Sequence, residues 1–145
     1  MALDFFVFST VFICLSIFFD FIITRLRIGD IGVDFLFFAP WLAGIIYGIA
    51  QGTILAIILT AVHVMFHPRV GHFIVTVLPS QVLSVILGKT LGPSGFWLAL
   101  FLFFLLGTII LRFFGRISGR YIGIIFVNSV LSIFLFFVIV PVVET

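Results

Sequence analysis

The chain has 145 residues, of which 64% are hydrophobic and only 8% charged, and its formal net charge is +2. A water-soluble domain of this size could not cover so much apolar surface, so the composition indicates a single integral membrane domain, 1–145. The few cationic residues are spread along the chain, which gives too little positive surface to bind nucleic acid through its phosphates.

Apolar runs long enough to cross a bilayer follow one another along the sequence. A helix needs roughly 20 residues to cross about 30 Å of hydrocarbon. The first run, at about 5–24, has no basic stretch before it and no small-residue cleavage pattern after it, so we expect a retained span and not a signal peptide. Later runs predict helices at about 73–91, 96–112 and 121–140.

The stretch from Phe35 to Phe66 is too long for one ordinary crossing, because its roughly 32 residues would form a helix of about 48 Å. We expect it to fold back at 49–53, around Gln51 and Gly52, where a glycine can supply unusual backbone angles. This predicts helices at about 34–50 and 53–66. The expected fold is therefore an all-α bundle of six transmembrane helices.

The cationic residues test this plan independently, because Lys and Arg in short loops collect on the cytoplasmic side of a membrane. With six spans, all six arginines lie on one side and Lys89 lies alone on the other; with five spans there is no such bias. We therefore expect both termini to lie outside, with the chain in the cell membrane. The arginines are Arg25, Arg27, Arg69, Arg112, Arg116 and Arg120.

Polar residues recur at helical spacings inside several predicted spans, and each helix should turn one polar stripe toward a common interior. Hydrogen bonding between helices explains most of them. A ligand site is the alternative, because short helices interrupted by Gly or Pro are where transporters tend to place one. The ligand-binding candidates are Thr60, His63, Gln81, Ser84 and Asn128.

Asp20 is an ionisable residue within the first span, where a charge costs several kcal/mol unless it is paired or hydrated. Arg25 follows about one helical turn later, near the predicted cytoplasmic end. We expect the two side chains to pair at the membrane interface.

All three histidines lie within ten residues, in AVHVMFHPRVGH. His63 and His67 are four apart and can face one ligand, and His72 follows the break at Pro68, so zinc, nickel or copper is a low-ranked possibility. The stretch contains no acid or cysteine, and an interfacial loop tolerates such residues well. We expect interfacial structure first, the edge of a ligand site second, and no bound cofactor.

Three arginines in RFFGRISGR, Arg112, Arg116 and Arg120, are spaced by four and form a basic stripe at the predicted cytoplasmic surface. Such a stripe attracts anionic lipid head groups, and equally an acidic surface of a partner protein. Membrane lipids are the favoured contact.

The passage IGVDFLFFAPWLAGIIYGIAQGTILAIILTAVHVMFHP, residues 31–68, resembles the second and third helices of the substrate-binding subunits of energy-coupling factor transporters. In that family an acidic residue also precedes a helix with a glycine-rich end, and a short helix of small residues follows. The rod-shape-determining membrane protein family has a similar plan of six helices. The resemblance implies a bundle that captures a vitamin or another micronutrient and works with a partner transmembrane subunit and ATPases.

Two functions follow as expectations. The first is a ligand-binding or membrane component of a small-molecule uptake system, which predicts a closed polar cavity between the stripes. The alternative is a non-catalytic accessory subunit of a larger membrane complex, which predicts a solid interior and contacts with other transmembrane subunits. An enzyme is not expected, because Asp30 and Asp34 have no base close by and the sequence GDIGVD also fits a helix cap and turn.

Overall fold

The computed structural model of this chain describes residues 2–26, 34–66, 73–113 and 119–143. Every regular element in these ranges is helical. In order they are α1 (Ala2–Leu26), α2 (Phe38–Tyr47), α3 (Ile49–Phe66), α4 (Phe73–Leu91), the short 3-10 helix η2 (Gly92–Gly95), α5 (Phe96–Phe113) and α6 (Gly119–Val143). The predicted all-α class is confirmed.

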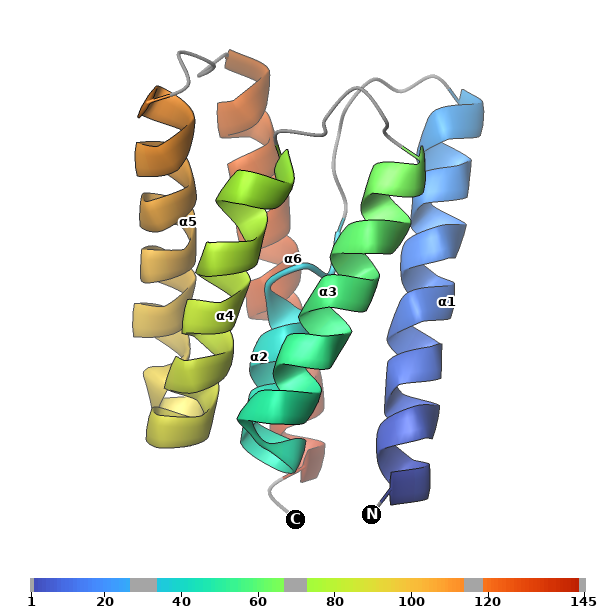
Figure 1. Ribbon diagram of the computed structural model, residues 1–145, viewed down its shortest axis with the longest axis vertical. Coiled ribbons are helices and arrows are strands. Elements are labelled where there is room, and N and C mark those ends of the chain that lie inside the picture. The colour runs from blue at the N-terminus through green and yellow to red at the C-terminus, as the bar shows by residue number, and fades with distance from the viewer. Residues whose placement is uncertain (1, 27–33, 67–72, 114–118, 144–145) are drawn as a thin grey trace.

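The long helices run side by side, and the two chain ends lie at the same end of the bundle (Figure 1). Four described stretches are long and apolar enough to cross a membrane: Asp4–Arg25, Ile49–Phe66, Val77–Phe113 and Ile122–Pro141. The third of these contains most of α4 and all of α5, which η2 joins in a reversal where Gly92 has a φ of 60°. The chain is thus built as an α-helical integral membrane protein.

The stretch at 35–66 does fold back, but the details differ from the prediction. The reversal lies at Gly48, whose φ of 102° is accessible to glycine and whose N–H bonds to the carbonyls of Ala43 and Gly44. Gln51 and Gly52, which were expected to form the turn, lie within α3. One glycine with a positive φ is enough to end α2, because this backbone angle turns the chain out of the helix.

The second helix is also much shorter than the predicted range of 34–50. It has 10 residues and rises about 15 Å, half the thickness of a hydrocarbon core. In Figure 1 it occupies only the lower part of the bundle, and the non-helical residues 34–37 lead into it from above. A backbone without helical hydrogen bonds is tolerated at this depth only where protein surrounds it, and Phe35, Leu36 and Phe37 are accordingly buried.

Glycines allow α2 to pack very closely against α3 and α4. A Cβ atom at Gly44 would lie 2.6 Å from the carbonyl oxygen of Val85, and one at Gly88 would lie 2.5 Å from that of Trp41. At Gly52 it would lie 2.7 Å from Cγ1 of Val85. Side chains at these positions would separate the backbones, so the small residues determine how near the helices come.

The contact with α6 is made by large rings instead. Phe136 stacks on Phe96 with ring centroids 4.2 Å apart and lies 6.1 Å from Trp41. Phe96 and Trp41 are fully buried and form an aromatic core that also includes Phe37 and Phe38. Aromatic side chains thus hold α6 further from the rest of the bundle than glycines hold α2.

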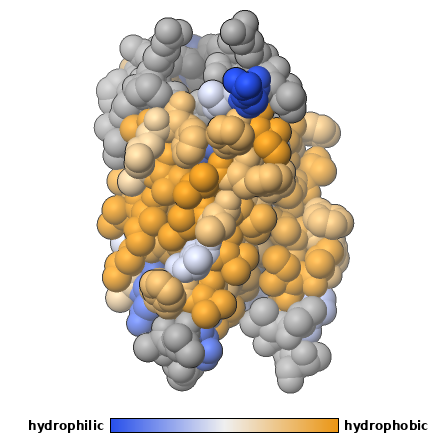
Figure 2. Space-filling model, turned by 90° about the vertical axis from the view of Figure 1, so that its right-hand side faces the viewer, coloured by the Kyte–Doolittle hydropathy of each residue, from blue (hydrophilic) through white to orange (hydrophobic). Residues whose placement is uncertain are grey.

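The outer surface is apolar over most of its height. On α1, Phe6, Val7, Phe18 and Phe21 are all more than half exposed. Figure 2 views the molecule from this side and shows a nearly continuous hydrophobic surface between more polar ends. Such a surface fits contact with lipid tails.

Candidate functional site

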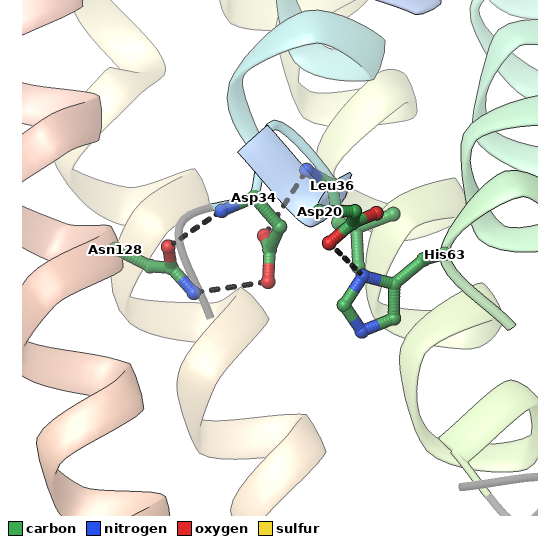
Figure 3. Close-up of polar contacts among 5 residues, drawn as sticks. All are labelled: Asp20, Asp34, Leu36, His63 and Asn128. Atoms are coloured by element: carbon green, nitrogen blue, oxygen red, sulfur yellow. Dashed lines mark hydrogen bonds and ion pairs between the residues drawn. The ribbon is translucent and has the colours of Figure 1, made fainter. Parts of the chain in front are cut away.

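A group of polar side chains from four segments meets inside the bundle. We call it the carboxylate–histidine cluster; it consists of Asp20 on α1, Asp34 ahead of α2, His63 on α3 and Asn128 on α6 (Figure 3). Asp20 lies about 9 Å, and Asn128 about 14 Å, from the nearer end of its helix. The cluster therefore lies well inside the apolar part of the bundle.

Asp34 and Asn128 bind each other reciprocally although 94 residues separate them. The backbone N–H of Asp34 donates to Oδ1 of Asn128 at 3.1 Å, and Nδ2 of Asn128 donates to Oδ2 of Asp34 at 3.0 Å. The second carboxylate oxygen, Oδ1, accepts from the backbone N–H of Leu36 at 3.2 Å. Asp34 therefore both closes the turn that starts α2 and connects this turn to α6.

Asp20 faces the histidine of a neighbouring helix. Its Oδ1 lies 3.5 Å from Nδ1 of His63, and both residues are buried, with exposures of 3% and 8% (Figure 3). The expected partner, Arg25, is exposed. It follows Asp20 by five residues, which turns it roughly 140° around the helix. The contact that the structure shows for Asp20 is thus interhelical and not the predicted one at the interface.

Three predicted ligand-binding residues form a second network between α3 and α4. The hydroxyl of Thr60 donates to Oε1 of Gln81 at 2.9 Å, and that of Ser84 donates to the backbone oxygen of Gln81 at 2.7 Å. All three residues are buried. Nε2 of Gln81 is buried without a hydrogen-bond partner among the described residues. The sequence grouped these residues with His63 and Asn128, whereas the structure separates them into two networks.

A small cavity adjoins the cluster on the side of α4, α5 and α6. Its volume is about 40 Å³, and Asp34 and Asn128 contribute to its wall together with Ser80, Phe103 and Gly107. We call it the Asp34 chamber. A cavity of this size holds one or a few water molecules, whereas sites for drug-sized ligands measure about 300–1,000 Å³.

The remaining candidates are only partly described. His67, His72 and Arg116 lie outside the described residues, and Arg120 is placed only as part of α6. Arg112 is exposed near the end of α5, where a lipid head group or a partner could reach it. In the described ranges no group of three or more acidic, histidine or cysteine residues is arranged to hold a metal ion.

Sequence reasoning missed Asp34 as a site residue. Its position at the start of the longest apolar stretch was visible, but the pattern GDIGVD fitted a cap and turn equally well. Asp34 does accept a hydrogen bond within a turn, from the N–H of Leu36, and its other carboxylate oxygen accepts from Asn128. It is not the cap of α2, because the N-cap residue is Phe37 and no side chain bonds there. The partner on α6 was not predictable from local spacing.

Comparisons with protein-family models, with curated proteins and with solved structures give no match for this chain. Its function is therefore argued from the geometry of the bundle.

Proposed function

We propose that the chain is a ligand-binding membrane component of a small-molecule uptake system. The observation that carries this proposal is the carboxylate–histidine cluster, of which Asp20, His63 and Asn128 are buried among apolar helices and Asp34 precedes a half-length helix. Ionisable residues within a membrane are costly and commonly mark the path of an ion or substrate. Transporters commonly build their sites where a spanning helix is interrupted, as it is before Phe38.

Within this proposal the chain crosses the membrane six times, and α2 together with the non-helical residues before it makes the second crossing. Arg25 and Arg112 lie near one end of the bundle and Lys89 near the other (Figure 1). The positive-inside rule then puts both termini outside a cell membrane. Introducing a cysteine at Ala2, in a Cys14→Ser background, tests this orientation with an impermeant thiol reagent. Labelling of intact cells is expected, and labelling only after lysis would reverse it.

The proposed ligand is a micronutrient, in line with the resemblance of residues 31–68 to substrate-binding subunits of energy-coupling factor transporters. The Asp34 chamber is too small for such a molecule as it stands. Ligand entry therefore requires α6 to move away from α5. The polar end of the ligand would then meet Asn128 and Asp34, and a partner transmembrane subunit with its ATPases would drive release. No nucleic acid takes part.

A non-catalytic accessory subunit is the second candidate, and one observation favours it. The residues Thr60, Gln81 and Ser84 are buried, hydrogen-bond to one another and lie among close helix contacts made at glycines. In this case the polar residues only hold helices together, and the exposed apolar faces contact other transmembrane subunits.

Binding to the purified full-length protein in lipid nanodiscs separates the two candidates. We expect one member of a panel of vitamins and related micronutrients to raise the thermal unfolding midpoint, and Asn128→Ala to abolish the effect. Thr90→Val, which alters an exposed hydroxyl bonded only to its own helix, should leave the effect intact. Absence of any stabilising ligand, together with stable co-purification in a larger membrane complex, would favour the accessory subunit.

A further inference from the structure

We propose that Asp34 is a proton-binding site, whose carboxyl group takes up and releases a proton through the chamber beside it. This goes beyond the proposed function and does not rest on it, because it concerns one carboxyl group and the water next to it. The reaction is a simple transfer. The carboxylate accepts a proton from a hydronium ion in the chamber, an O–H bond forms, and water remains.

The first argument is the nature of the groups that bind Asp34. Its two carboxyl oxygens accept from the backbone N–H of Leu36 and the side-chain amide of Asn128, which are both neutral. A carboxylate held only by neutral donors in an apolar bundle keeps most of the cost of its charge. Protonation removes this cost, and the remaining oxygen lone pairs still accept hydrogen bonds.

The second argument is the set of charged groups that face Asp34. Asp20 on α1 repels a negative charge on Asp34, whereas His63 on α3 attracts it. His63 lies directly against Asp20, however, at 3.5 Å. From α4, α5 and α6 the described wall of the chamber contributes only apolar residues, Ser80 and Asn128. Among the described residues a single imidazole thus serves two carboxyl groups and lies against Asp20. Asp34, whose hydrogen-bond donors are neutral, is the carboxyl group placed to carry a proton.

The third argument is access. Asp34 is half-buried and borders the chamber, whereas Asp20 is 3% exposed. A volume of about 40 Å³ admits water, and a proton needs only one oxygen atom to receive it. A hard metal ion would need about six oxygen ligands. The side chains of the described wall offer fewer, because Asp34 contributes two oxygen atoms and Asn128 and Ser80 contribute one each.

Dicyclohexylcarbodiimide tests the proposal, because the O–H group of a protonated carboxyl within a membrane adds across a C=N bond of this apolar reagent. The O-acylisourea that forms rearranges to a stable N-acylurea without any further reactant. The full-length protein is reconstituted in phosphatidylcholine nanodiscs, labelled over a range of pH, and mapped by peptide mass spectrometry. We expect one stable adduct, on Asp34. Its yield should fall as pH rises, by about tenfold per pH unit once most of the group is ionised.

Asp20→Asn is the matched control, and it should leave the adduct on Asp34 in place, whereas Asp34→Asn should remove it. If Asp34→Asn does not fold, mapping of the wild-type adduct decides the question alone. An adduct only on Asp20, or labelling of Asp34 that does not change with pH, would overturn the proposal. So would full protection of Asp34 by sodium ions at constant pH, because that identifies a metal cation site. The assay needs neither ligand nor transport, so its result is independent of the micronutrient screen.

Discussion

The two sides of α2 are packed by opposite means. Toward α3 and α4, Gly44, Gly52 and Gly88 bring backbones into direct contact, and the polar residues there bond to each other. Toward α6, Phe136 and its aromatic neighbours act as spacers, and a water-sized cavity with Asp34 and Asn128 in its wall remains. In lipid, burial of apolar side chains does not by itself drive helices to associate. The close backbone approach therefore stabilises the contact of α2 with α3 and α4. The second side keeps a cavity of about 40 Å³.

The largest expected effect is on the glycine side. Gly44→Ala and Gly88→Ala each put a Cβ atom within 2.6 Å of a backbone oxygen, which cannot move aside as a side chain can. We expect each to lower the free energy of unfolding by about 3 kcal/mol. Circular dichroism during unfolding by SDS in mixed micelles measures the loss.

Gly123→Ala is the control for these two variants, because a Cβ atom there would meet nothing within 4 Å. It should be neutral or slightly stabilising, as alanine favours a helix over glycine. Equal losses of unfolding free energy at Gly44, Gly88 and Gly123 would contradict the proposed contrast between the two sides of α2.

On the α6 side, the strongest single connection is the one between Asn128 and Asp34. Asn128→Leu deletes the partners of both the Asp34 carboxylate and the Asp34 backbone N–H. We expect a loss of about 2 kcal/mol in the same unfolding assay. Ser129→Ala, at the next residue of α6, should be close to wild type. An Asn128→Leu variant with the unfolding free energy of the wild type would show that the aromatic rings alone position α6.

The ring of Phe136 should contribute less to the free energy of unfolding than the Asn128–Asp34 connection does, although it contacts Phe96, Trp41 and Trp97. Lipid tails replace most of the apolar contact that Phe136→Ala removes, so only the ring geometry is lost, which costs about 1 kcal/mol. Phe134→Ala, at a lipid-facing position with 61% exposure, serves as the comparison. The two variants would behave alike if α6 were not held by Phe136.

The smallest effect is expected at Thr60. Thr60→Val keeps the shape of the side chain but removes its hydrogen bond to Gln81, and such bonds between membrane helices average about 0.6 kcal/mol. Thr90→Val is the matched control on an exposed surface. A loss several times larger at Thr60 would mean that the Gln81 network, and not the glycine contacts, holds α3 to α4.

Sequence reasoning reached the helical class, the reversal within 35–66 and the burial of Gln81 and Asn128, because these depend on composition and local spacing. It expected His63 at the interface first, whereas the structure buries this residue against Asp20. It placed the reversal a few residues late, because the sequence does not show which of Gly48 and Gly52 forms the turn. Only the packing of Gly52 against Val85 assigns Gly52 to a helix. It also paired Asp20 with its sequence neighbour Arg25. The contacts of Asp20 with His63 and of Asp34 with Asn128 join distant segments, and no spacing rule encodes them.

The distance along the chain between Asp34 and Asn128 has a consequence for how the protein is made. Asp34 leaves the ribosome 94 residues before Asn128, so its carboxyl group cannot bond to this amide until the last helix has been made. The ten residues of α2 are also too few to partition into lipid alone, so α2 and α3 enter together as a hairpin. A chain truncated before residue 119 would leave Asp34 without this amide.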